Sequence, residues 1–202
     1  MIITDIKKNK NAAGYAVFAD GEFLFSLDSD TILSEGIKKG TEIEREALEE
    51  LYERSLFHKA KEKALRLLDK RAHSKAEIIR KVSEKYPKNV SVSVADYLEE
   101  LGLLNDKDFA LLYGRELIEF KKFGRGRVIT ELFRRGIKRE IIDEVLSEFS
   151  FDNSEEIIVS LLSKRKVNLS DEKEKRRAFQ RLLREGYSFD DIKKAMAISE
   201  ED

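Results

Sequence analysis

The chain contains Leu132-Phe133-Arg134-Arg135-Gly136-Ile137 and, 50 positions later, Leu182-Leu183-Arg184-Glu185-Gly186-Tyr187. Each segment reads as the last turn of a helix, because glycine commonly follows a helix C-terminus. The apolar positions that follow also match in pairs: Ile142 with Ile192, Val145 with Ala195, and Leu146 with Met196. A repeat of this length predicts stacked helical units, each burying its apolar face partly against a neighbour.

An earlier unit with the same order of helices precedes these two. Ser74-Lys75-Ala76-Glu77 has the spacing of a capping box that starts a helix, and Gly102 marks the end of the next one. The third helix of this unit is expected to begin near Ser93, after the single proline, Pro87. The predicted fold is mainly α, with tandem three-helix repeats in an elongated curved array and a small N-terminal β-hairpin or meander.

The first residues follow a β pattern. Tyr15–Ala19 and Glu22–Leu27 flank Asp20-Gly21, a dipeptide typical of the tight turn in a β-hairpin. Such a hairpin is marginally stable alone and should pack on another element. The predicted parts are the hairpin and connector (1–43), a first repeat with its lead-in helix (44–105), and three-helix repeats over 106–151 and 152–202.

Composition narrows the class of protein. Of 202 residues, 41% are hydrophobic and 39% are charged, with one proline and no cysteine. Few prolines favour helices, and the apolar share is large enough for a buried core. The lack of cysteine excludes disulfides, a thiol nucleophile and Cys-ligated zinc. No apolar run approaches the ~18 residues of a membrane span, and Met1–Asp5 does not resemble a signal peptide, so a cytoplasmic protein is expected.

A net charge of −1 hides an uneven distribution of charge. Lys121–Arg139 contains eight basic residues and one acid, Glu131. Lys59–Lys81 and Lys164–Arg184 each contain nine basic and three acidic residues. For these two flanking stretches, solvated helix faces with internal ion pairs are favoured. For Lys121–Arg139 we favour a binding surface for a polyanion or an acidic protein, because only Glu131 is available within it for pairing.

The sequence contains no catalytic constellation that supports an enzyme. The two histidines, His58 and His73, are far apart in the chain, and Gly124-Arg125-Gly126-Arg127 lacks the pattern of a phosphate-binding Walker loop. This glycine-rich segment is interpreted either as a flexible link between helices or as a mobile basic loop that meets phosphate or carboxylate. No metal or cofactor is expected.

The aromatic residues divide into two groups. Those on apolar stripes are expected in the core: Phe109, Tyr113, Phe133 and Phe179. Phe123 lies among the basic residues and is the one candidate for stacking beside them.

A tandem helix-turn-helix reader of DNA bases is a further interpretation. A recognition helix needs Arg, Lys, Asn or Gln toward the base edges. The third helices instead carry acids: Asp96, Glu99, Glu100, Glu140, Asp143, Glu144, Asp190 and Asp191. Any nucleic-acid contact should therefore be electrostatic and independent of base sequence.

Three ordered blocks resemble RecX, the bacterial regulators of RecA recombinase. They are Leu65-x-Leu67-Leu68-x-x-Arg71-x-His73-Ser74-x-x-Glu77, the block from Leu98 through Leu101-Gly102-Leu103-Leu104-Asn105-Asp106 to Phe109-Ala110, and the block with Gly126, Ile129, Glu131-Leu132 and Gly136-Ile137. The resemblance spans about residues 60–196, and the N-terminal hairpin is similar to an extension of longer members. Two positions depart from the family pattern: Asn105 replaces a common acid, and Tyr187 follows the third repeat's glycine.

The resemblance implies a non-enzymatic protein that lies along the groove of the RecA–DNA filament. It implies restraint of strand exchange, ATP hydrolysis and coprotease activity, and it transfers no catalytic or binding residue to this chain.

The contact surface is instead hypothesised from charge. The primary basic patch is Lys121, Lys122, Arg125, Arg127, Arg134, Arg135, Lys138 and Arg139. The secondary basic face is Arg176, Arg177, Arg181 and Arg184. The expected partners of a monomer are the RecA filament and single- or double-stranded DNA, without a membrane. The alternatives are a sequence-independent nucleic-acid binder with no recombinase partner and a scaffold for an acidic protein.

Overall fold

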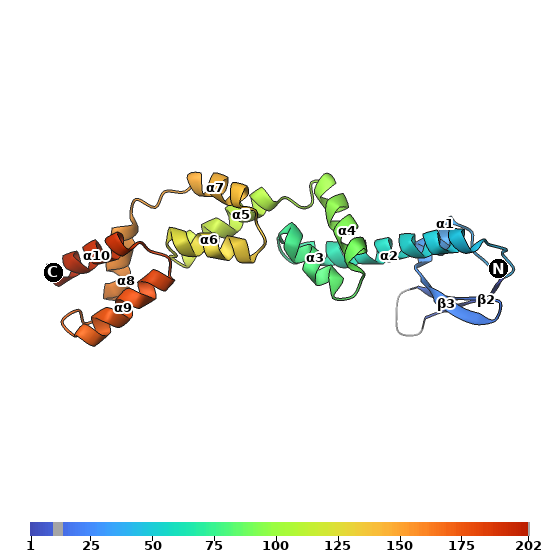
Figure 1. Cartoon of the computed structure of the whole chain (residues 1–202), viewed down its shortest axis with the longest axis horizontal. Helices are drawn as coiled ribbons and strands as arrows, with labels where there is room; N and C mark the ends of the chain where they lie inside the picture. Colours follow the sequence, from blue (N-terminus) through green and yellow to red (C-terminus); the bar gives the residue numbers. More distant parts are fainter. Residues whose placement is uncertain (10–13, 202) are drawn as a thin grey trace. The chain divides into compact units, whose positions relative to one another are not determined.

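The computed structural model describes residues 1–9 and 14–201, and the chain divides into two compact units, Met1–Leu104 and Asn105–Asp202. The described residues are mainly helical, with one small antiparallel sheet near the N-terminus (Figure 1). The predicted class of a helical protein with an N-terminal β-meander is therefore confirmed.

The sheet is a meander of β1 (Ile3–Lys8), β2 (Tyr15–Ala19) and β3 (Glu22–Leu27). Neighbouring strands are antiparallel. The turn between β2 and β3 places Asp20 at φ 50° and Gly21 at φ 87°. Two successive positive φ angles are what this type of tight hairpin turn requires, which explains the Asp-Gly pair.

The sheet packs on the first half of a long helix. α1 (Ser29–Ser34) and α2 (Arg45–Leu68) follow the strands, and Phe25 stacks on Tyr52 with ring centroids 4.6 Å apart. The buried side chains of this N-terminal core are Ile3, Val17, Ala19, Leu27, Ile37, Leu48 and Leu51. The expectation that the hairpin packs on another element is confirmed.

The second half of α2 forms the first three-helix repeat with α3 (Lys75–Ser83) and α4 (Lys88–Glu100) (Figure 1). The predicted capping box is present, with the Glu77 N–H donating to the Ser74 hydroxyl at 3.1 Å. The predicted start of the third helix near Ser93 is wrong, because α4 begins directly after Pro87. Proline suits this place, since its fixed φ is compatible with the start of a helix.

The second repeat comprises α5 (Asp106–Arg115), a π-helical segment η1 (Glu116–Phe120), α6 (Arg125–Arg134) and α7 (Arg139–Ser147). The third repeat comprises α8 (Ser154–Lys164), α9 (Glu172–Arg184) and α10 (Phe189–Glu201). Each has a buried apolar core of its own.

The 50-residue periodicity is visible in the two cores. Leu132 and Leu182 are both fully buried, and so are Ile142 and Ile192. Gly136 has φ 80° and Gly186 has φ 92°, so both helices end in the left-handed conformation that glycine favours. Among the described helices, none is long and apolar enough to cross a membrane.

Candidate basic interaction surface

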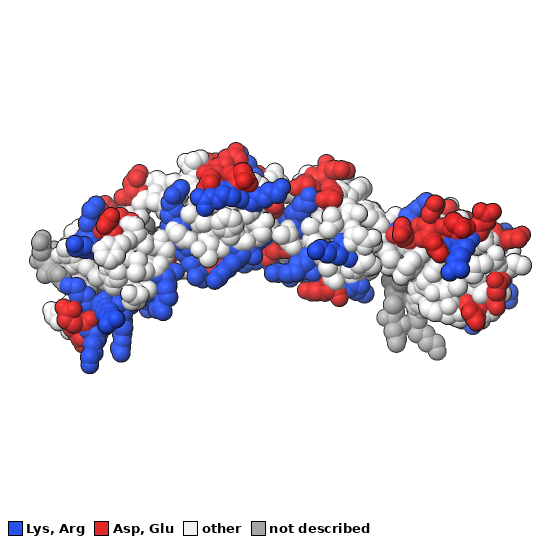
Figure 2. Space-filling model, viewed as in Figure 1, with Lys and Arg blue, Asp and Glu red and all other residues white. Residues whose placement is uncertain are grey.

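Basic side chains gather on the second and third repeats. Figure 2 shows Lys and Arg concentrated over α6 and α9, whereas acidic side chains gather over α7. The acids predicted on the third helices, among them Glu140 and Asp143, are exposed on α7. In these repeats the basic side chains thus gather on second helices, and the acids of α7 do not suit base readout, which needs donors toward the base edges.

Several of the predicted contact residues form ion pairs within the protein. Glu131 accepts from Arg127 at 2.6 Å and from Arg134 at 3.2 Å. Arg139 pairs with Asp143 at 2.7 Å, and Lys121 pairs with Glu116 at 3.0 Å. The expectation that only Glu131 is available for pairing is therefore wrong. The expectation considered only acids within Lys121–Arg139. Glu116 and Asp143 lie outside that stretch, but each is about one helical turn from its partner, Lys121 or Arg139.

The Tyr113 ring contacts two cations of the primary patch, Arg135 and the already paired Lys121. The guanidinium of Arg135 lies 4.8 Å from the centre of the Tyr113 ring and donates to its hydroxyl at 3.3 Å. The Lys121 ammonium lies 5.7 Å from the same ring. These cation–π contacts hold part of the basic charge beside the second repeat's core.

Six cations of the two predicted surfaces are exposed and have no ion pair within the described residues. They are Lys122, Arg125, Lys138, Arg176, Arg177 and Arg184. The remaining member of the secondary face, Arg181, pairs with Glu185 at 3.0 Å. Because exposed ion pairs contribute little stability, the paired cations can exchange partners at modest cost, but the six unpaired ones are the most accessible.

The aromatic residue beside this charge is Phe120 rather than Phe123. Phe123 is half-buried against the second repeat's core, with the Arg127 guanidinium 5.6 Å from its ring centre, so it is unsuited to stacking on a ligand. Phe120 is 79% exposed and directly precedes Lys121. Phe133, expected in the core, is 45% exposed.

The position of Phe120 follows from the π-helical segment. Helical spacing from Phe109 through Tyr113 and Leu117 would place Phe120 on the buried stripe. The Lys121 N–H instead donates to the Glu116 carbonyl, five residues back, at 3.2 Å. This wider turn rotates the following side chains away from the stripe, and such segments often occur at functional sites.

The glycine-rich segment Gly124–Arg127 packs against the third repeat. The N–H of Gly124 donates to the Glu185 carbonyl at 2.9 Å, and the N–H of Gly126 donates to the Gly186 carbonyl at 3.0 Å. Gly124 is the N-cap of α6 and has no side chain to cap the helix, so the carbonyls of the two residues that follow α9 satisfy amides that would otherwise lack a partner. Both interpretations of this segment from sequence, a flexible link and a mobile basic loop, are therefore wrong, because the segment forms the N-cap and first turn of α6.

Glycine is required on both sides of this contact, which we call the glycine joint (Gly124, Gly126, Gly186). A Cβ on Gly124 would lie 2.5 Å from the Gly186 carbonyl carbon. A Cβ on Gly186 would lie 2.1 Å from the backbone nitrogen of Arg127. The joint thus sets the first turn of α6, which carries Arg125 and Arg127, against the last turn of α9.

Tyr187 adds a side-chain bond to the glycine joint. Its hydroxyl donates to the Lys122 carbonyl at 2.6 Å, and the residue is 6% exposed. Burial, with a smaller contribution from the negative charge of Glu185, raises the pKa of Tyr187 to about 12. The tyrosine that departs from the family pattern is therefore a structural residue of the joint.

Three residues of the first block quoted above form one network. Arg71 donates to both oxygens of Glu77, each at 3.2 Å, and the His73 ring nitrogen Nδ1 lies 2.9 Å from the Arg71 carbonyl. The Glu77 side chain also completes the capping box with Ser74. These residues build the start of α3.

Comparison with known proteins finds relatives in the RecX family. Family models match the RecX N-terminal domain at residues 1–44, the first three-helix domain at 60–98 and the second at 105–146. The chain is 29% identical to Regulatory protein RecX of Clostridioides difficile, over 96% of this chain and 94% of the relative. It is 30% identical to Regulatory protein RecX of Clostridium acetobutylicum, over 92% and 89% of the two chains.

Two solved structures share the fold. A crystal structure of regulatory protein RecX matches with a TM-score of 0.69 and 21% identity, covering 100% of this chain and 99% of the other. A crystal structure of RecX from Lactobacillus salivarius matches with a TM-score of 0.61 and 23% identity, covering 73% of this chain and 98% of the other. The tandem three-helix architecture is thus shared with these proteins.

Proposed function

Because the chain belongs to the RecX family of regulatory proteins, we propose that it binds the RecA–DNA filament and restrains its recombinase, ATPase and coprotease activities. It acts without a cofactor and catalyses no reaction itself. The single observation that carries the mode of binding is the set of exposed, unpaired cations on the second and third repeats, with Arg125 on α6 and Arg184 on α9 as its central members.

The glycine joint supports simultaneous binding through both helices. The main chain connects the start of α6 to the end of α9 by two hydrogen bonds, which supports a common contact surface for Arg125 and Arg184 within the second unit. Two contacts made by one connected surface raise the overall affinity without any new kind of interaction. A single copy of the chain can therefore make both contacts with the filament, and no dimer is needed.

The protein restrains the activities of the filament if it binds one conformational state of the filament more tightly than the others. A ligand shifts a conformational equilibrium only by its difference in affinity for the two states. Cations that contact acidic recombinase surface and DNA phosphates at once meet this condition in an assembled filament. A protein bound in this way opposes the subunit motions that ATP hydrolysis and strand exchange require.

RecA ATPase activity on preformed filaments tests this mode of binding. Arg125→Glu/Arg184→Glu should inhibit at least about tenfold less than the unchanged protein at equal concentration, since two cations become acids. Arg125→Glu places an acid in the first turn of α6, where the helix dipole favours it, whereas Arg184→Glu places one in the last turn of α9, where the dipole disfavours it by about 0.3–1 kcal/mol at an exposed position. Circular dichroism of the double variant verifies that it is folded before its inhibition is compared.

A charge-matched control separates local contact from net charge. Lys88→Glu/Lys193→Glu makes the same change at two exposed lysines outside both basic surfaces. It should inhibit as the unchanged protein does. Full inhibition by Arg125→Glu/Arg184→Glu, or an equal loss in the control, would remove these arginines from the mechanism.

A sequence-independent nucleic-acid binder is the second candidate function. The exposure of Phe120 beside Lys121 and Lys122 favours it, because single strands bind to surfaces that combine basic charge with stacking aromatics. Binding of naked DNA that weakens steeply with salt, together with no effect on RecA ATPase, would decide for this candidate.

A further inference from the structure

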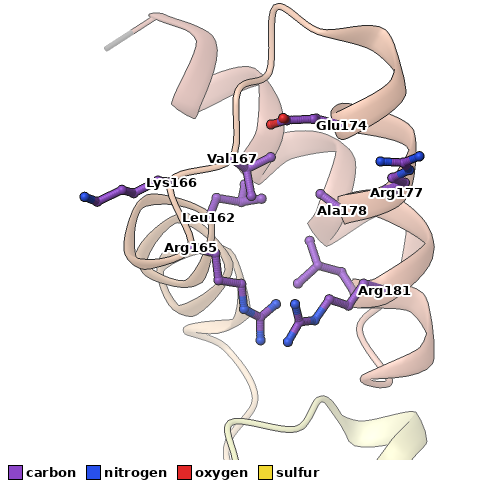
Figure 3. A pocket seen from close by; sticks show the side chains of 9 residues that line it. Leu162, Arg165, Lys166, Val167, Glu174, Arg177, Ala178 and Arg181 are labelled. Carbon is purple, nitrogen blue, oxygen red and sulfur yellow. The ribbon is translucent and has the colours of Figure 1, made fainter.

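A pocket of about 370 Å³ lies between α8 and α9 in the third repeat (Figure 3). Its lining residues come from the end of α8, the following loop and one face of α9. The charged members are Arg165, Lys166, Glu174, Arg177 and Arg181, and the apolar members are Leu162, Val167, Ala178 and Leu182. Its volume is in the range of pockets that bind small organic ligands.

Two guanidinium groups converge at one end of this pocket. Figure 3 shows the side chains of Arg165 and Arg181 pointing toward one another from opposite helices. Glu185 holds both, accepting two bonds from Arg165 at 3.0 and 3.1 Å and one from Arg181 Nε at 3.0 Å. The Glu185 side chain is only 15% exposed, so it fixes the two arginines from beneath.

The charge around the pocket remains positive after this pairing. The lining contains four cations and one carboxylate, Glu174, which already accepts from the Asn168 N–H at 3.0 Å. Arg181 uses Nε for Glu185, so its terminal N–H groups can face a ligand. Arg177 lies one turn before Arg181 on the same face of α9 and has no ion pair within the described residues.

We propose that this pocket binds a phosphate group carried by a nucleotide or by a single-stranded nucleic acid. Phosphate offers several oxygens to the planar fork of arginine and forms strong charge-assisted hydrogen bonds with it. A lone carboxylate fits less well, because it offers two oxygens where a phosphate group offers more to the terminal N–H groups of Arg181 and to Arg177. The apolar side of the pocket, with Val167 and Ala178, provides a surface for the attached sugar or base.

Arg177 and Arg181 also belong to the secondary basic face, so this site rests on the proposed contact with DNA and deepens it. It is tested without the recombinase, so that its failure is distinguishable from a failure to restrain RecA. The measurement is binding of a fluorescent oligothymidylate to the full chain across a range of salt concentrations. Arg177→Gln/Arg181→Gln should weaken binding by roughly tenfold or more, because it removes two charged donors. The slope of log affinity against log salt should become shallower by about 0.7 for each lost contact with a single strand.

Lys88→Gln/Lys193→Gln is the matched control, since it removes two positive charges from exposed helix positions outside the pocket. This control should have the same slope of log affinity against log salt as the unchanged protein, and an affinity within about twofold of that protein's. Equal losses in the two variants would show general attraction by net charge and would overturn the proposal. An unchanged slope and affinity in Arg177→Gln/Arg181→Gln, or no binding by the unchanged protein, would also overturn it.

A second measurement uses the unchanged protein and does not depend on the folding of a variant. Phenylglyoxal modifies accessible arginines, and mass spectrometry reports the rate at each one. Oligothymidylate should slow the modification of Arg181 and Arg177 more than that of Arg45, an exposed arginine of the other unit. Equal protection of all three would contradict the site.

Thymidine monophosphate distinguishes the two sources of phosphate. If the free nucleotide displaces the oligonucleotide and protects Arg181, the pocket takes a terminal phosphate. If only the oligonucleotide protects Arg181, the pocket takes the phosphodiester of a strand. Protection by neither would overturn the assignment of phosphate to this pocket.

Discussion

The backbone N–H of Gly126 donates a hydrogen bond to the carbonyl oxygen of Gly186, with 3.0 Å between the nitrogen and the oxygen. This bond satisfies an amide in the first turn of α6 with the carbonyl of the glycine that follows the C-cap of α9, so the start of one helix is fixed against the end of the other across the second and third repeats. The first repeat differs, because α3 is capped by its own Ser74 and Glu77.

Gly186→Ala should destabilise the second unit by more than about 3 kcal/mol, because the strain of a positive φ adds to overlap with the Arg127 backbone. Gly102→Ala is the control, since Gly102 has φ 71° and open space around its Cβ position. It should cost only about 1–2 kcal/mol. Urea unfolding measures both, and equal costs would contradict a close contact at Gly186.

Hydrogen exchange tests the same contact without a denaturant. The amides of Gly124 and Gly126 should be protected in the unchanged protein, since both donate to the third repeat. Gly186→Ala should speed the exchange of these two amides more than it speeds the exchange of the amides in α7. Rapid exchange of both amides in the unchanged protein would be inconsistent with the joint.

Stability should fall with alkaline pH through Tyr187. Its pKa is raised to about 12 in the folded protein, against about 10 in the unfolded chain. Its contribution is therefore complete below about pH 10 and is lost as pH rises toward about 12, by at most about 3 kcal/mol. Tyr187→Phe should remove this component and cost about 1 kcal/mol at neutral pH through the bond to Lys122. Urea unfolding at several pH values measures both effects, and an unchanged alkaline loss in Tyr187→Phe would exclude this tyrosine as its source.

Arg71→Ala should reduce stability by about 1–3 kcal/mol, because it leaves the Glu77 carboxylate with 3% exposure and without its bidentate partner. Solvent screening keeps this cost moderate, since Arg71 is 47% exposed. Arg66→Ala, which breaks an exposed pair with Glu62 at 3.7 Å, should cost less than about 0.5 kcal/mol. Thermal unfolding compares the two variants. Loss of RecA inhibition by folded Arg71→Ala would instead indicate a direct contact.

Phe120→Ala should weaken binding to single-stranded DNA by about tenfold, because one stacked base is worth roughly 1–3 kcal/mol. It should change stability by less than about 0.5 kcal/mol, since the ring is 79% exposed. Leu33→Ala changes a comparably exposed apolar residue, at 78%, in the other unit and should leave binding unchanged. Fluorescence anisotropy provides the affinities, and equal binding by Phe120→Ala would exclude stacking.

The sequence predicts those parts of the fold that depend on local chemistry. Asp20-Gly21 supplies a hairpin turn, Ser74 and Glu77 supply a helix start, and Gly136 and Gly186 end helices, because each feature needs only neighbouring residues. The buried stripes follow from helical spacing for the same reason.

Other features depend on contacts that spacing alone does not contain. The joint brings Gly126 to Gly186, 60 positions away, and a glycine-rich segment gives no sign of such a partner. Glu116 pairs with Lys121 although it lies outside the basic stretch. Phe120, for which no prediction was made from the sequence, is exposed because one π-helical turn shifts it off the apolar stripe.

Co-sedimentation with preformed RecA–DNA filaments, compared with the same DNA without RecA at equal salt, tests the central claim most directly. Binding to the filament should be saturable and at least about tenfold tighter than binding to bare DNA, and it should be weakened in Arg125→Glu/Arg184→Glu. Equal affinity for filament and bare DNA would contradict it and would identify a general nucleic-acid binder.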